Sequence, residues 1–239
     1  MKHQLLFSLL ASLCLFSCQE KTEEVPIEIL RLEKSLFDVK SPQEVGALMK
    51  NYPFLKTYLG ADSDVNDSLV VGQLYANVSN AQLRQFAQEL QAQFGDLGRL
   101  QKDLQQAFGQ LKKEYPDFKP PKIVTAITGF MGSDLYVTDS LVVIGLDYFG
   151  GPKAKYRPPL YDYQLRRYEQ AYLVPNLLFL MAKPYIKVPP QDQTLLADMI
   201  WFGKGYEFVK HIAPDTPDSL IIGYSQEQLD DVYASQQDI

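Results

Sequence analysis

The sequence has 239 residues, 46% of them hydrophobic, so it is long enough to bury a sizeable core in one globular domain. The formal net charge is −6 and no basic cluster stands out, which argues against a nucleic-acid partner, because phosphate binding needs a basic face. Both cysteines, Cys14 and Cys18, lie near the N-terminus, so the remaining chain cannot form an internal disulfide.

The N-terminus has the pattern of a secretory signal. Lys2 is followed by an apolar run over residues 4–16, which is shorter than the roughly 20 residues that a membrane-spanning helix needs. The run ends in Leu15-Phe16-Ser17-Cys18, which looks like a lipobox. We therefore predict a lipoprotein signal peptide over residues 1–17. A plain signal peptide that contains a cysteine is the alternative interpretation.

Acylation of Cys18 would anchor the mature chain. Stable anchoring needs more than one acyl chain, and a triacylated cysteine supplies three. Residues 18–25 are polar and are expected to form a tether between lipid and domain. Because Gln19 rather than aspartate follows the cysteine, we expect the outer membrane, with the domain facing the periplasm.

Residues 26–239 are predicted to form a single α+β domain. The first segment, from Ile27 to Phe37, indicates a strand or an extended entry, and Ser41-Pro42 begins a short helix. Two amphipathic helices follow, one capped by Ser79 or Asn80 and one over residues 97–111.

The centre of the chain changes to a strand pattern. Residues 122–130 are β-branched, and residues 135–137 and 141–146 follow at short spacing. This spacing predicts a small antiparallel β-meander flanked by helices, with residues 141–146 in a central position because they are apolar on both faces.

Helical patterns return after the strands. They cover residues 165–181 and 194–209, and a last helix begins at Ser225, with Gln228 three residues later as a capping box. This last helix carries an apolar face close to Ile239, so the domain is expected to be incomplete at the C-terminus.

A loop between strands and helices is rich in aromatic and basic side chains. Tyr156, Arg157, Tyr161 and Tyr163 lie within it, among prolines. Interfaces favour Tyr and Arg, so we predict a contact surface for a protein partner. A packed irregular loop is the equally open alternative.

Several phrases of the sequence resemble the GldB family of gliding-motility lipoproteins of Bacteroidota. They run in order through almost the whole chain: Asn51-Tyr52-Pro53-Phe54, Pro116 to Lys122, Asp139 to Gly150, Tyr172-Leu173-Val174-Pro175, Met199 to Lys204, and Pro214 to Tyr224. Family members typically run on for several tens of residues, so the resemblance implies a C-terminally shortened member.

The resemblance implies an outer-membrane lipoprotein that supports gliding motility and the associated type IX secretion machinery. Its partners would be other envelope proteins of that machinery, met through protein–protein contacts, and the membrane, met through the lipid. The sequence suggests no cofactor.

The family is also distantly similar to zincin-type metallopeptidases, whose HExxH helix supplies two zinc-binding histidines. The equivalent stretch here, Tyr168 to Pro175, has no histidine, and Trp201 and Phe202 stand where a ligand glutamate is expected. The remaining histidine, His211, is expected near a helix end, where a cationic ring favours the helix dipole. We therefore expect a degenerate zincin-like fold that is not an enzyme. A hydrolase with a cryptic site and a ligand-binding lipoprotein remain alternatives.

Overall fold

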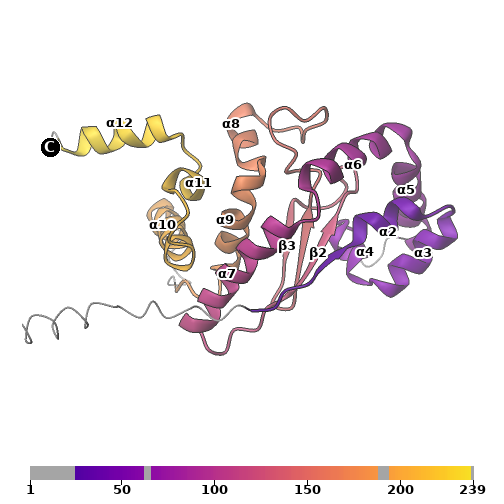
Figure 1. The fold of residues 1–239 in the computed structure, drawn as a ribbon, viewed down its shortest axis with the longest axis horizontal. Helices are drawn as coiled ribbons and strands as arrows, with labels where there is room; N and C mark the ends of the chain where they lie inside the picture. The colour runs from indigo at the N-terminus through magenta and orange to yellow at the C-terminus, as the bar shows by residue number, and fades with distance from the viewer. Residues whose placement is uncertain (1–24, 62–65, 188–193, 238–239) are drawn as a thin grey trace, which may run out of the picture.

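The computed structural model describes residues 25–61, 66–187 and 194–237 (Figure 1). The predicted signal peptide, Cys18 and nearly all of the predicted tether lie outside the described residues. Within them the protein is α+β, as predicted: helices cover a small sheet on both faces.

The elements follow one another in an order that places most helices before and after the strands. They are β1 (Ile29–Arg31), α2 (Leu32–Asp38), α3 (Pro42–Asn51), α4 (Phe54–Tyr58), α5 (Asp67–Ser79), α6 (Ala81–Phe94), α7 (Gly98–Glu114), β2 (Lys122–Ala126), β3 (Leu135–Val137), β4 (Leu141–Gly145), α8 (Asp162–Leu165), η2 (Arg166–Tyr168), α9 (Gln170–Met181), α10 (Leu195–Ile212), α11 (Asp218–Ile222) and α12 (Gln226–Gln237).

The sheet is mixed, so the predicted antiparallel meander is wrong. Its strand order is β1-β2-β4-β3; β1 and β2 pair in parallel, β2 and β4 pair in parallel, and only β3 and β4 are antiparallel. The chain leaves β2, forms β3 at the far edge and returns through β4 between the two. The short spacing favoured a meander, but β4 is apolar on both faces and takes the doubly covered central place.

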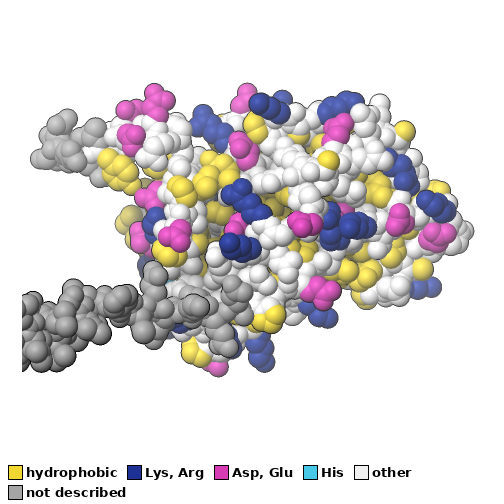
Figure 2. Space-filling model, in the orientation of Figure 1, with side chains coloured by type: hydrophobic (Ala, Val, Ile, Leu, Met, Phe, Trp, Pro, Cys, Tyr) yellow, Lys and Arg dark blue, Asp and Glu magenta, His cyan; other side chains and the backbone are white. Residues whose placement is uncertain are grey.

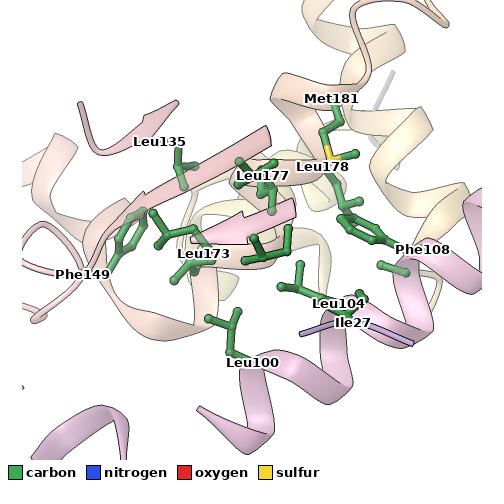
Figure 3. Close-up of a cluster of buried hydrophobic side chains, with 14 of the residues drawn as sticks. Ile27, Leu100, Leu104, Phe108, Leu135, Phe149, Leu173, Leu177, Leu178 and Met181 are labelled. Atoms are coloured by element: carbon green, nitrogen blue, oxygen red, sulfur yellow. The ribbon is translucent and has the colours of Figure 1, made fainter. Parts of the chain in front are cut away.

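Alternate residues of the central strands point to opposite faces, and each face has its own core. Ile123 of β2 and Val142 of β4 join the larger cluster, beneath α7, α9 and α10. Figure 3 shows Leu104 of α7 and Leu177 of α9 among the side chains of this cluster. Val124 and Val143 face the other way and pack with side chains of α2 to α5.

The entry segment of the chain runs antiparallel to α7. The Arg31 guanidinium donates to the Gly95 carbonyl at 2.7 Å, and the Gln101 side chain donates to the Ile27 carbonyl, also at 2.7 Å. Arg31 thus lies beside the start of α7 and Ile27 lies further along it. From Arg31 back to Ile27, the chain therefore runs in the direction of the C-terminal end of α7.

The predicted helix starts are confirmed. The Ser41 hydroxyl accepts the Glu44 N–H, the Asn80 side chain accepts the Gln82 and Leu83 N–H groups, and Ser225 and Gln228 form the reciprocal pair of a capping box. Helix α5, by contrast, was not predicted. It buries Val70, Leu74 and Val78 and packs against α3.

Over residues 25–61, 66–187 and 194–237, we find no helix with the length and apolar character needed to cross a bilayer.

Candidate functional site

A buried carboxylate lies at the edge of the sheet where β2 and β4 both end. Asp147 follows β4 and is 1% exposed. Its Oδ2 accepts the backbone N–H groups of Thr128 at 3.1 Å and Phe130 at 2.8 Å. Asp147 therefore fixes the loop that follows β2, residues 127–134, which we call the β2–β3 loop.

The second oxygen of Asp147, Oδ1, is buried without a hydrogen-bond partner. Burial raises the pKa of the Asp147 carboxyl, and the backbone N–H groups of Phe130 and Thr128 only partly oppose this. A raised pKa favours the protonated acid, which carries no charge and therefore costs less to bury. The group can thus hold a proton at higher pH than an ordinary aspartate.

Three tyrosines surround this loop and bind it. Tyr58 donates to the Ser133 carbonyl at 3.0 Å, Tyr148 donates to the Gly132 carbonyl at 2.7 Å, and Tyr168 donates to Asp134 Oδ2 at 2.8 Å. Burial raises the pKa of Tyr148 to about 12 and also raises the pKa values of Tyr58 and Tyr168, with nearby aspartates adding to the effect. The phenols therefore remain donors at physiological pH.

Glycine is required where the tyrosines meet the loop. A Cβ on Gly132 would lie 2.3 Å from the Tyr58 ring, and a Cβ on Gly145 would lie 2.9 Å from the Ser133 carbonyl oxygen. The sequence pattern alone does not single out Asp134 or Asp147 as site residues. The signal that could have marked Asp147 is its place directly after an apolar strand, between Leu146 and Tyr148.

The predicted partner-contact residues divide into an inner and an outer group. Tyr161 and Tyr163 are 74% and 67% exposed, and their rings stack at a centroid distance of 5.9 Å. Tyr156 is half-buried and packs edge-on against Phe86 of α6 at 5.3 Å. Arg157 is exposed and donates to the Pro152 carbonyl at 3.5 Å. Tyr156 thus anchors the loop whose outer end presents the tyrosine pair.

Local hydrogen bonds fix this outer end. The Gln164 side chain accepts the Tyr161 N–H at 3.2 Å, and Leu165 is buried beneath the short helix α8. A hollow of about 400 Å³ lies further back along the same loop, between α6 and Lys153 and Lys155. The exposed part of the loop is therefore aromatic at one end and basic at the other.

The stretch compared with a zincin helix has other contacts. Tyr168 is bound to Asp134, and the rings of Trp201 and Phe202 pack on Phe179 of α9 at 5.3 and 5.6 Å. His211 lies in the last turn of α10, as predicted, and pairs with Glu114 at 3.4 Å. No three His, Cys, Asp or Glu side chains come together as metal ligands within the described part of the chain.

A larger groove lies between α7, α9 and the turn after α10. Its volume is about 1090 Å³, and it is lined by apolar side chains such as Leu100 and Val174 together with polar ones such as Gln106 and Asp103. It is open to solvent. Its mixed lining suits an elongated, partly apolar ligand or peptide.

The family model described as gliding motility protein GldB matches residues 17–239 of this chain. The chain belongs to the GldB family. This membership confirms the resemblance seen in the sequence and identifies the protein as a gliding-motility lipoprotein. No curated protein sequence and no solved structure matches the chain significantly.

Proposed function

We propose that this GldB-family chain is a non-catalytic component of the gliding apparatus and of the associated type IX secretion machinery. It is anchored in the outer membrane by acylated Cys18, faces the periplasm and acts by binding other envelope proteins. It uses the exposed end of the Lys153–Tyr163 loop for that contact.

The observation that carries this proposal is the stacked, exposed pair of Tyr161 and Tyr163. Two aromatic rings held parallel on a short, hydrogen-bonded turn present apolar area that loses little conformational entropy on binding. Tyrosine and arginine are enriched in the residues that dominate interface energies, and Arg157 lies on the same loop.

The test is site-specific cross-linking in the native membrane. A photo-reactive amino acid at position 163 of the full-length protein, expressed in gliding cells, is expected to capture a specific envelope protein that mass spectrometry identifies. The matched control is the same amino acid at Leu69, an exposed apolar residue of α5 with a side chain that is 62% exposed. Capture at both positions alike, or at neither, would contradict the proposal.

Replacing both tyrosines tests the consequence. For this variant, Tyr161→Ser with Tyr163→Ser, the photo-reactive amino acid is placed at the neighbouring position 160. Capture of the partner is expected to be lost and colony spreading to be reduced, while the protein remains at normal abundance in the outer membrane. Unchanged spreading would refute this surface as the working contact.

The groove of about 1090 Å³ favours a second candidate function, that of a ligand-binding envelope lipoprotein. Native mass spectrometry of the protein released gently from membranes separates the two functions. A stoichiometric small molecule that is lost with Val174→Trp would favour the ligand-binding function. A hydrolase function would require hydrolytic turnover by the purified full-length chain.

A further inference from the structure

The first half of α10 carries apolar side chains on both sides of the helix. One side packs on the body of the protein, where Phe179 of α9 meets the rings of Trp201 and Tyr206, each at 5.3 Å. The opposite side is open to solvent. Its large side chains are between 45% and 75% exposed, and we call them the α10 apolar face: Leu195, Leu196, Met199 and Ile200.

Four large apolar side chains on neighbouring turns form a contiguous patch, and such patches mark surfaces that meet another protein, a ligand or a membrane. The patch lies at one end of the molecule, at the left of Figure 1, where Figure 2 shows hydrophobic side chains over α10 to α12. Helices α3 and α5 lie at the other end.

The same end receives the N-terminus of the domain. The entry segment runs antiparallel to α7, so Ile27 lies further along that helix than Arg31, in the direction of its C-terminal end. There Glu114 pairs with His211 of α10, and the ring of Tyr115 lies 6.3 Å from that of Phe208. Going back from Arg31 to Val25, the described chain thus runs along α7 towards the helix end that α10 contacts.

The number of residues between the anchor and the domain limits their separation. Val25, the first described residue, is the seventh residue after Cys18. Seven residues span at most about 25 Å when fully extended. Acyl chains on Cys18 therefore hold Val25 within about 25 Å of the bilayer surface.

We infer that the α10 apolar face lies in the surface of the bilayer that holds the lipid anchor. The helix inserts Leu195, Leu196 and Met199 between the head groups, in the manner of an interfacial amphipathic helix. This inference rests on the acylation of Cys18, which is part of the proposed function. It adds to that function an orientation: the bilayer covers one end, and α5 points away from it.

The charges beside the face agree with a lipid surface. Lys183, Lys187 and Lys204 are exposed around the turn that leads into α10, and Lys204 donates to the Lys187 carbonyl at 3.1 Å. Lysines beside an apolar face attract anionic head groups. Asp198 and Glu207 are the exposed acids of α10 and keep this attraction modest.

Paired fluorescent labels on the acylated full chain test the orientation. The variants are Met199→Cys in the face and Leu69→Cys on α5; both parent side chains are 62% exposed. Because the sulfur of acylated Cys18 is a thioether, an environment-sensitive thiol dye attaches only to the new cysteine. Each protein is reconstituted in vesicles of phosphatidylethanolamine and phosphatidylglycerol, with or without lipids that carry a quencher near the head group.

The label at position 199 is expected to shift to shorter wavelength and to lose fluorescence with the quencher lipids, while the label at 69 does neither. If both labels stay equally exposed to water on an acylated, vesicle-bound chain, the inference is overturned and the anchor stands. Shielding of position 199 from both lipid-borne and water-soluble quenchers would mean that protein covers the face, and would also overturn it. A free Cys18 thiol, seen in the mass of the N-terminal peptide, would refute the anchor and, with it, the inference.

Discussion

The loop after β2 and the loop after β4 leave the same edge of the sheet, yet they direct their aromatic and polar groups in opposite ways. The β2–β3 loop is held by groups from other segments: Tyr58 and Tyr148 donate to its backbone carbonyls, Tyr168 donates to the Asp134 side chain, and Asp147 accepts two of its backbone N–H groups. In the loop after β4, Tyr161 and Tyr163 stack on each other and face solvent. Tyrosines that donate hydrogen bonds to the β2–β3 loop stabilise the fold, whereas the exposed, stacked Tyr161 and Tyr163 rings are accessible to a partner.

The largest expected effect on stability comes from removing the Asp147 carboxyl, which holds the β2–β3 loop. In Asp147→Ala the N–H groups of Thr128 and Phe130 lose their acceptor. Since an unsatisfied buried donor costs about 1–3 kcal/mol, we expect a loss of roughly 3 kcal/mol in the free energy of unfolding, measured in urea. Asp139→Ala, at an exposed turn, is the control and should change stability little. Equal effects of the two changes would show that Asp147 does not fix the loop.

A smaller loss is expected from crowding the same loop. Gly132→Ala places a methyl group against the Tyr58 ring, and forced overpacking costs about 1–3 kcal/mol. Gly72→Ala is the matched control: it lies in α5, and a Cβ there meets nothing within 4 Å. Because alanine favours a helix over glycine, the control should be neutral or stabilising in a thermal melt. A stable Gly132→Ala protein would argue against the close approach.

The pH dependence of stability tests whether Asp147 holds a proton beneath the β2–β3 loop. Because the pKa of Asp147 is raised in the folded state, the folded protein binds the proton more tightly than the unfolded chain does. The contribution of this group is therefore fully present below the ordinary carboxyl pKa and is lost as pH rises through the raised value. Asp147→Asn, which keeps an acceptor and never ionises, should remove that part of the slope in urea titrations. A slope equal to that of the wild type would contradict the assignment.

Substitutions at the exposed end of the Lys153–Tyr163 loop should change stability least. Tyr161→Ser with Tyr163→Ser removes side chains that are mostly solvated, so the free energy of unfolding should change by less than about 0.5 kcal/mol. Tyr156→Ser is the contrast, because its ring packs on Phe86 and its loss should destabilise the protein measurably. If the outer pair proved as costly as Tyr156, the loop would be a packed structural element rather than a contact surface.

Local chemistry allowed part of this structure to be predicted. Caps such as Ser41 and Asn80 act within one helical turn, so sequence suffices to locate them. Helix α5 escaped prediction because Val70, Val71 and Gly72 have low helix propensity, and its burial against α3 overrides this.

The strand order of the sheet and the hydrogen bonds of Asp147 could not be predicted for a related reason. Whether β4 pairs with β2 or follows it as a meander depends on which faces the helices cover, and the spacing of the strands does not report this. Similarly, nothing in the residues around Asp147 shows that Thr128 and Phe130, far back along the chain, supply its hydrogen bonds. The exposed Tyr161 and Tyr163 were easier to recognise, because the loop composition itself suggested them.

The parallel pairing of β1 with β2 has a consequence for the way the protein acquires its structure. The buried Glu33, just after β1, accepts a hydrogen bond from Thr125 of β2, and the two residues are 92 positions apart. Contacts so distant in sequence form slowly, since the intervening chain must first be brought together. During export, β1 would emerge first and remain unpaired until β2 follows. Its three-residue length leaves few unpaired backbone groups, which limits wrong pairing with other chains in the meantime.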